Sequence, residues 1–178
     1  MLWLTLRQLK SKQAPARRRA AEQLSQDPDP KAYAALVTAL TDEDEEVRRL
    51  VVTAFSKMED ERRIEPLINA LRDRSPEVLK VALTGIKTST DARVVPAMVP
   101  LMRHMDPGVR GYAASLLYAR GWRPEERDEQ LHYQIASGQL SKAALHGSAA
   151  IQSLETVIQT GNYQQRIAAV EALGRIDD

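Results

Sequence analysis

The chain has 178 residues, and its 25 lysines and arginines stand against 24 aspartates and glutamates, for a formal net charge of +1. This balance is typical of a solvated surface and disfavours a protein built to neutralise phosphates. The absence of cysteine excludes disulfides and thiolate metal sites. The apolar start, residues 1–6, reaches Arg7 too early for a signal peptide, and no apolar run approaches the length of a membrane span. We therefore expect a soluble, cytoplasmic protein.

An apolar pattern recurs every 31 residues. Segments that begin at Ala14, Glu45, Pro76 and Pro107 align without a gap, and each carries small or apolar residues at positions i, i+4, i+5 and i+8. This spacing is that of one buried helix face, so it predicts a series of equivalent helices. The columns expected in the core are Ala16, Val47, Val78 and Val109; Ala20, Val51, Ala82 and Ala113; Ala21, Val52, Leu83 and Ala114; and Leu24, Phe55, Ile86 and Leu117.

A second apolar stripe of the same period precedes each of these helices, so each unit is predicted to be a helix A followed by a helix B. Helices A are expected at about residues 1–10, 30–41, 61–73, 92–104 and 148–160, and helices B at about 14–26, 45–57, 76–88, 107–120 and 163–176. The helix A columns expected in the core are Leu2, Tyr33, Ile64 and Val95; Leu6, Val37, Ile68 and Val99; and Leu9, Leu40, Leu71 and Met102.

Residues suited to cap a helix stand before both helices of the unit. Their side chains accept hydrogen bonds from backbone N–H groups that the first turn leaves free. Pro76 and Pro107 follow two of the caps, at the first helical position, where the missing N–H costs nothing. Pro100 lies deeper in the fourth helix A, so we expect a bend there. The expected caps are Asp29, Asp60 and Asp91 for helix A, and Asp44, Ser75 and Asp106 for helix B.

The period breaks after Leu117 and resumes 25 residues late, in a stripe that begins at Ile151. The extra segment, about residues 122–146, predicts one helix to about Ala136 and a shorter one near 140–145, separated at Ser137-Gly138. We expect Trp122 to fill the packing mismatch where the period breaks, and Trp3 to pack across the first helix pair. The apolar residues that the insert is expected to bury are Leu131, Tyr133, Ile135, Leu140 and Leu145.

The motif Asp106-Pro107-Gly108-Val109-Arg110, at the start of a helix B, resembles the HEAT-like repeats named for phycobilisome lyases. The insert, with Gly-Trp-x-Pro and then Tyr133-Gln134-Ile135-Ala136, is similar to an element between repeats in bacterial members of that group. The resemblance implies an all-α, right-handed α-solenoid of about five HEAT-like helix pairs. It further implies one domain over residues 1–178, with units of about 1–28, 29–59, 60–90, 91–121 and 147–178 around the insert.

The family arginine at the fourth position of helix B matches this chain in part, at Arg17, Arg48, Arg110 and Arg166, but the third unit has Leu79 there. The aspartate that partners it in the family is present as Asp42 and Asp73 only, so we expect an incomplete polar ladder between repeats. The same column holds Ser11, His104 and Thr160 in the other units.

In the family the second helices line the concave face and bind protein partners, so the resemblance implies a protein-binding scaffold. On that face one column is basic toward the N-terminal end and its neighbour becomes apolar toward the C-terminal end, with Tyr112 and Tyr118 as candidate anchors. Ordinary helix surface is the competing interpretation. The predicted partner-binding residues are Arg18, Arg19, Arg49, Leu50, Lys80, Val81, Tyr112 and Ser115.

Two other functions compete with the protein-binding scaffold. The family name suggests a bilin lyase or isomerase subunit, in which Arg49, Lys80 and Tyr112 would hold the tetrapyrrole. A HEAT-like nucleic-acid binder is the second, on the run from Arg17 to Arg19, although consecutive residues on a helix point in different directions.

The sequence predicts no catalytic residue, no cofactor and no metal site. The three histidines, His104, His132 and His146, are widely spaced, and none belongs to an HExxH motif. We therefore expect a protein that is not an enzyme.

The last predicted helix lacks the polar outer face that terminal repeats normally carry. We expect Val170, Leu173 and Ile176 to leave part of the final helix pair exposed. This predicts either a fragment of a longer solenoid or self-association through the C-terminal end.

Overall fold

Every regular element between residues 2 and 176, the part of the chain that the computed structural model describes, is an α-helix or a 3₁₀ turn. Contacts divide the chain into two units, Met1–Val94 and Val95–Asp178. The prediction of a single domain over residues 1–178 stays a prediction. The last two residues, Asp177 and Asp178, lie outside the described part.

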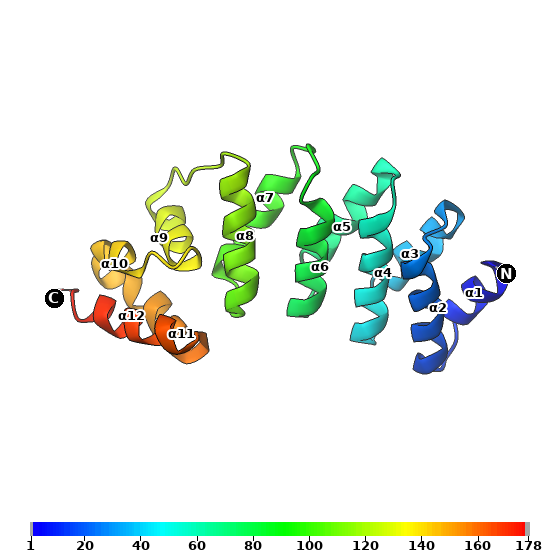
Figure 1. The fold of residues 1–178 in the computed structure, drawn as a ribbon, viewed down its shortest axis with the longest axis horizontal. Helices are drawn as coiled ribbons and strands as arrows, with labels where there is room; N and C mark the ends of the chain where they lie inside the picture. Colours follow the sequence, from blue (N-terminus) through cyan, green and yellow to red (C-terminus); the bar gives the residue numbers. More distant parts are fainter. Residues whose placement is uncertain (1, 177–178) are drawn as a thin grey trace. The chain divides into compact units, whose positions relative to one another are not determined.

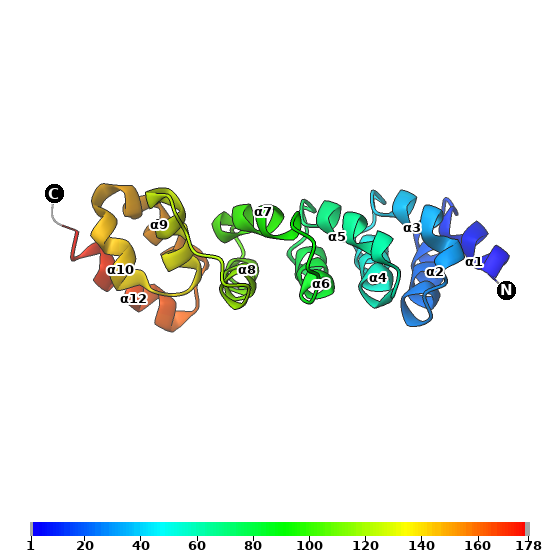
Figure 2. The same cartoon turned by 90° about the horizontal axis from the view of Figure 1, so that it is seen from above.

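The first unit consists of three successive helix pairs. Its helices B, α2, α4 and α6, pack side by side, and its helices A, α1, α3 and α5, lie in a second layer behind them (Figures 1 and 2). Short 3₁₀ turns, Pro30–Ala32 and Glu61–Arg63, lead into α3 and α5. The bounds are α1 Leu2–Leu9, α2 Ala14–Gln26, α3 Tyr33–Ala39, α4 Glu45–Lys57, α5 Ile64–Ala70 and α6 Pro76–Ile86.

The second unit follows from α7 onward. The short α7 continues into the 3₁₀ turn Val99–Arg103, which packs against α8, and α11 and α12 form the last pair. The α-helix changes to a 3₁₀ turn at Val99-Pro100, the place where the sequence predicts a bend. The bounds are α7 Val94–Met98, α8 Pro107–Ala119, α9 Arg127–Ala136, α10 Leu140–Ala143, α11 Ile151–Thr160 and α12 Tyr163–Leu173.

The buried face of the helices B is the one that the 31-residue period predicts. All four columns are buried from the second unit of the period onward, and Ala16 in the first is half-buried. Phe55 on α4 is the largest of these fully buried side chains. Its ring meets that of Tyr33 edge-on, with centroids 5.7 Å apart. The predicted register of helices B is therefore confirmed.

The middle of the three columns expected in the core of the helices A departs from the prediction. Val37 is 40% exposed, whereas Leu36, Leu67 and Met98 are fully buried and share the same period. The two flanking columns, which begin at Leu2 and Leu9, are buried or half-buried at every position. The prediction that Val37 is a core residue is wrong.

The predicted caps are confirmed. Each of the six side chains accepts a hydrogen bond from a backbone N–H in the first turn of its helix or 3₁₀ turn. For the helices B the donors are the backbone N–H groups of Val47, Val78 and Val109. These bonds fix where each helix begins, independently of the packing.

The insert is helical and contributes buried side chains to the core of the second unit. Leu131, Ile135 and Leu140 pack with Leu154 in the core of the second unit. The helix α9 packs against α8 as α5 packs against α4, so it occupies the place of a helix A. Leu145, however, is 82% exposed, so the prediction that the insert buries it is wrong. The chain departs from helical geometry two residues later, at Gly147, whose φ is 63°.

Neither tryptophan is a core residue. Trp122 is half-buried against Tyr133, with ring centroids 6.0 Å apart. Trp3 is 67% exposed, and its ring lies under the guanidinium of Arg7 at 5.6 Å. The prediction that Trp3 packs across the first helix pair is wrong.

The last helix exposes apolar side chains, as the sequence predicts. Val170 is exposed, and Leu173 and Ile176 are half-buried against the core of the second unit. Tyr163 and Ile167 extend the exposed stripe toward the start of α12. Self-association through this end stays a prediction.

Gly85 lies where α6 packs tightly against its neighbours in the first unit. A Cβ at this position of α6 would lie 2.9 Å from Cβ of Ser56 and 3.0 Å from two methyl carbons of Leu67. We expect Gly85→Val to lower the free energy of unfolding by about 2 kcal/mol, because the added atoms overpack the contact. Urea unfolding measures this loss.

A double-variant cycle tests the cause. Leu67→Ala in the same chain removes the crowded methyls, so the double variant should lose less stability than the sum of the two single variants. Strictly additive losses would contradict the assigned contact.

Candidate functional site

The helices B of the first unit present one stripe of accessible side chains each. On every helix the stripe begins at a basic residue and continues four residues later, which places both side chains on the same face. We call this surface the B-layer stripe. Its residues are Arg18 and Glu22 on α2, Arg49 and Thr53 on α4, and Lys80 and Thr84 on α6.

The adjoining column is only partly accessible. Arg19 on α2 is exposed and Val81 on α6 is half-buried, but Leu50 on α4 is buried at 9% exposure. The helix α4 has a helix B on each side, and these neighbours cover the flank that carries Leu50. The prediction that Leu50 is exposed is therefore wrong, and its contact with a partner stays a prediction.

Each basic residue of the B-layer stripe already has an acidic neighbour. Nη2 of Arg18 lies 2.6 Å from Asp44, which is the cap of the next helix B, and Arg49 pairs with Glu46 at 2.7 Å. These guanidinium groups hold the pKa values of Asp44 and Glu46 below their usual range. On α6, Nζ of Lys80 lies 2.9 Å from Glu77. The stripe is thus a surface of mixed charge.

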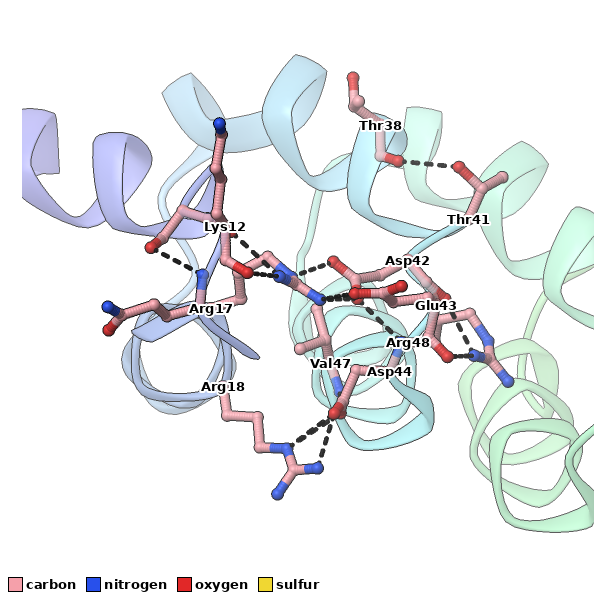
Figure 3. Close-up of polar contacts among 12 residues, drawn as sticks. Lys12, Arg17, Arg18, Thr38, Thr41, Asp42, Glu43, Asp44, Val47 and Arg48 are labelled. Atoms are coloured by element: carbon pink, nitrogen blue, oxygen red, sulfur yellow. Dashed lines mark hydrogen bonds and ion pairs between the residues drawn. The ribbon is translucent and has the colours of Figure 1, made fainter. Parts of the chain in front are cut away.

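The neighbouring arginine column forms a buried ladder between repeats. Nε and Nη2 of Arg17 donate to both carboxylate oxygens of Asp42, at 2.7 and 2.9 Å (Figure 3). Its Nη1 donates to the backbone carbonyls of Ser11 and Lys12 in the preceding turn. The basic run at 17–19 is therefore divided, since Arg17 is buried in the ladder while Arg18 and Arg19 face solvent.

Arg48 repeats this arrangement one unit later. Its Nε and Nη2 donate to Asp73 at 2.7 and 3.0 Å, and its Nη1 donates to the carbonyls of Asp42 and Glu43. The carboxylate of Asp73 raises the pKa of the Arg48 guanidinium. Bidentate, charge-assisted pairs of this kind are strong and directional. We infer that these arginine–aspartate pairs hold successive repeats together.

The ladder is incomplete, as the sequence predicts. Leu79 is buried in the arginine column of the third unit, and Arg166 is exposed. Arg110 is 5% exposed, and its Nη1 donates to the carbonyls of His104 and Met105 at 2.8 Å each. Among the described residues no carboxylate accepts a hydrogen bond from its Nε or Nη2, and burial lowers the pKa of this guanidinium. The sequence places Arg110 in the arginine column. Only the folded chain shows that its guanidinium is buried without a carboxylate partner between residues 2 and 176.

The remaining predicted residues lie on α8 in the second unit. Tyr112 is half-buried and Ser115 is exposed, and the Ser115 hydroxyl donates to the Tyr112 carbonyl at 2.8 Å. Tyr118 is exposed, with the guanidinium of Arg123 4.8 Å from its ring centroid. These residues belong to a different unit from the B-layer stripe.

The described residues contain no group of three or more histidine, cysteine, aspartate and glutamate side chains arranged to hold a metal ion. His132 lies beside Asp128, with 3.4 Å between Nε2 and Oδ1, and burial lowers its pKa. Between residues 2 and 176 no helix has the length and apolar character needed to cross a membrane.

A family model described as HEAT repeats matches residues 4–73, which include the two complete ladder pairs of the first unit. This part of the chain is therefore similar to HEAT repeats. The crystal structure of an engineered protein is similar over 98% of this chain and 96% of its own length, with 19% identity and a TM-score of 0.52. A designed armadillo repeat protein aligns over 99% and 100%, with 20% identity and a TM-score of 0.49. No curated protein matches the chain.

These findings confirm the predicted fold class, an all-α repeat fold of HEAT-like helix pairs. They define the chain as a helical repeat protein of the α-solenoid class, similar to HEAT repeats over residues 4–73. Membership of the phycobilisome-lyase group stays a prediction, because the matching model covers HEAT repeats in general.

Proposed function

We propose that this chain is a protein-binding scaffold and that the B-layer stripe holds a segment of its partner. The observation that carries the proposal is the regular spacing of accessible side chains on α2, α4 and α6, three helices packed side by side. A surface with one stripe per repeat suits an extended partner chain, because each repeat can contact a different point along that chain.

The ion pairs of the stripe favour a partner of mixed charge. A phosphate or a bilin propionate would have to displace Glu46 or Glu77 from the cation that each already neutralises. A protein segment with both acidic and basic side chains can instead exchange these pairs for equivalent ones across the interface. This argument favours the scaffold over the nucleic-acid and bilin-lyase hypotheses.

Site-specific photo-crosslinking in the source cell tests the proposal. The photoreactive residue p-benzoylphenylalanine would replace Thr53 or Thr84 on the B-layer stripe and, as the matched control, Val37 on the opposite layer, which is also exposed. We expect a discrete cross-linked protein from the two threonine positions and none from Val37. Products from Val37 alone would mean that the partner binds the helix A layer.

We expect substitution of Tyr112 to weaken partner binding more than substitution of Arg18. It is half-buried on α8, in the second unit, and aromatic side chains of this kind carry much of the binding energy in protein interfaces. We expect Tyr112→Ala to weaken binding of the cross-linked partner by about tenfold or more. Arg18→Ala should weaken it by less than about threefold, because exposed ion pairs contribute little.

Surface-plasmon kinetics with the purified partner measures both variants. Circular dichroism is the control, since neither change touches a fully buried side chain and the helical signal should stay that of the wild type. A larger loss for Arg18→Ala than for Tyr112→Ala would contradict the aromatic anchor.

A further inference from the structure

The two complete ladder sites define what a buried arginine of this column requires. In both, Nη1 binds two carbonyls of the preceding turn, while Nε and Nη2 bind a carboxylate that follows the arginine by 25 residues. The carboxylate compensates the charge that burial takes out of water. A guanidinium in this setting is a fork shaped for the two oxygens of one carboxylate.

Arg110 has half of this site. Its Nη1 binds two carbonyls as in the other units, and it is as deeply buried as Arg48. The residue 25 positions later, however, is Ile135, an apolar side chain of α9. The carboxylate of Asp106 acts on Arg110 through space but accepts no hydrogen bond from it. Nε and Nη2 of a buried cation are thereby left without the acid that the fold supplies elsewhere.

A cavity of about 210 Å³ lies where that acid would be expected. Arg110 and Ile135 both line it, and Arg110 is the one charged residue among its described lining. The apolar walls include Leu140 and Val157, and Gln165 of α12 lies at its edge. A second cavity of about 50 Å³, also lined by Arg110 and Ile135, adjoins the same guanidinium. The larger space equals roughly seven water volumes, enough for an acid with a short carbon chain.

We propose that this cavity binds a small free carboxylic acid, whose carboxylate pairs with Nε and Nη2 of Arg110 in the way that Asp42 and Asp73 pair with Arg17 and Arg48. The carbon chain of the ligand then lies between Ile135, Leu140 and Val157. The site is in the second unit, so the inference does not depend on the B-layer stripe.

The chemistry of the lining selects a carboxylate over a phosphate. A phosphate carries up to two charges and is usually held by several cations or N–H groups, whereas this cavity offers one guanidinium and apolar walls. A monocarboxylate brings one charge and two oxygens for the two free donors. Transfer of its apolar carbon chain from water into the cavity lowers the free energy of binding. A hydrated inorganic anion has no such apolar part.

Calorimetric titration with 3-methylbutanoate tests the proposal, with its uncharged amide and inorganic phosphate as comparisons. We expect the acid to bind the wild type with a Kd of roughly 1 mM and the amide at least about tenfold more weakly. In ¹⁵N spectra the Nε resonance of Arg110 should shift on addition of the acid, which locates the ligand.

A matched pair of variants tests the role of the missing acid. Ile135→Asp supplies an internal carboxylate at the ladder position, so it should lose binding of the acid, whereas Ile135→Asn has the same shape without the charge and should keep it within about threefold. Ala168→Leu is the second variant, because Ala168 is half-buried at the cavity and the larger side chain fills it without touching the carbonyl bonds of Arg110. It should weaken binding by about tenfold or more.

Several results would overturn the proposal. Phosphate that binds as tightly as the acid would exclude carboxylate selectivity, and binding that survives both Ile135→Asp and Ala168→Leu would place the ligand elsewhere. Failure of the Arg110 Nε resonance to move at about 10 mM acid, ten times the expected Kd, would exclude the site. Binding of an acidic peptide when free acids do not bind would make the surface a protein contact instead.

Discussion

Val51→Asp is expected to lower the free energy of unfolding by about 4 kcal/mol or more, because it buries an unpaired carboxylate. Val51 is fully buried near the middle of α4, and α4 has α2 on one side and α6 on the other. The new charge therefore lies far from water and from the ends of the helix, where a dipole or cap would stabilise it. Such a loss is comparable to the whole stability of many domains.

Val37→Asp is the matched control, since it makes the same chemical change at an exposed valine of α3. We expect it to change the free energy of unfolding by no more than about 0.5 kcal/mol. Denaturant unfolding of the two variants measures the difference. Equal losses would mean that the two faces are not buried as the structure has them.

Arg48→Leu is expected to cost about 3 kcal/mol or more, because it leaves the carboxylate of Asp73 buried without its partner. The two side chains are 5% and 9% exposed, and two hydrogen bonds join them. The carbonyls of Asp42 and Glu43 also lose their donor. Thermal unfolding, with Arg19→Leu as the exposed control on the same layer, measures the loss.

The chain itself supplies the compensating change. The third unit carries Leu79 in the arginine column and His104 in the aspartate column. Nδ1 of His104 accepts the backbone N–H of Asp106 at 3.0 Å, just as Asp73 accepts that of Ser75 at 2.8 Å. Adding Asp73→His to Arg48→Leu should therefore keep the turn and remove the unpaired charge, and part of the lost stability should return at pH 8. A double variant less stable than Arg48→Leu would contradict this explanation.

Local features of the chain could be predicted well from the sequence. The caps Asp44 and Asp106 and the change of helix type at Pro100 depend on residues within one turn of each other. The buried face of the helices B repeats at a strict period, so one error in register would have shown in every unit. The incomplete ladder could be predicted as well, because the residue types at its two columns are visible in the aligned repeats.

The candidate site was predicted less completely. Arg18, Arg49 and Lys80 are accessible as expected, but their acidic partners lie either in the turn before the next helix or within the same helix, and only the folded chain shows which pairs form. Leu50 shares its column with Arg19, Val81 and Tyr112, so the repeat pattern predicts that it is exposed. Its burial comes from the helices on both sides of α4, which a single-helix pattern does not include.

The sequence by itself determined the helix pairs, their period, their caps and the buried stripe of the helices B, because each depends on spacing along the chain. The tertiary structure decided the exposure of Val37, Leu50 and Leu145, since exposure depends on what neighbouring helices cover. It also decided the environment of Arg110. The packing of α9 against α8 brings Ile135 to the cavity beside this guanidinium, and so leaves a buried cation facing a cavity that no local pattern reveals.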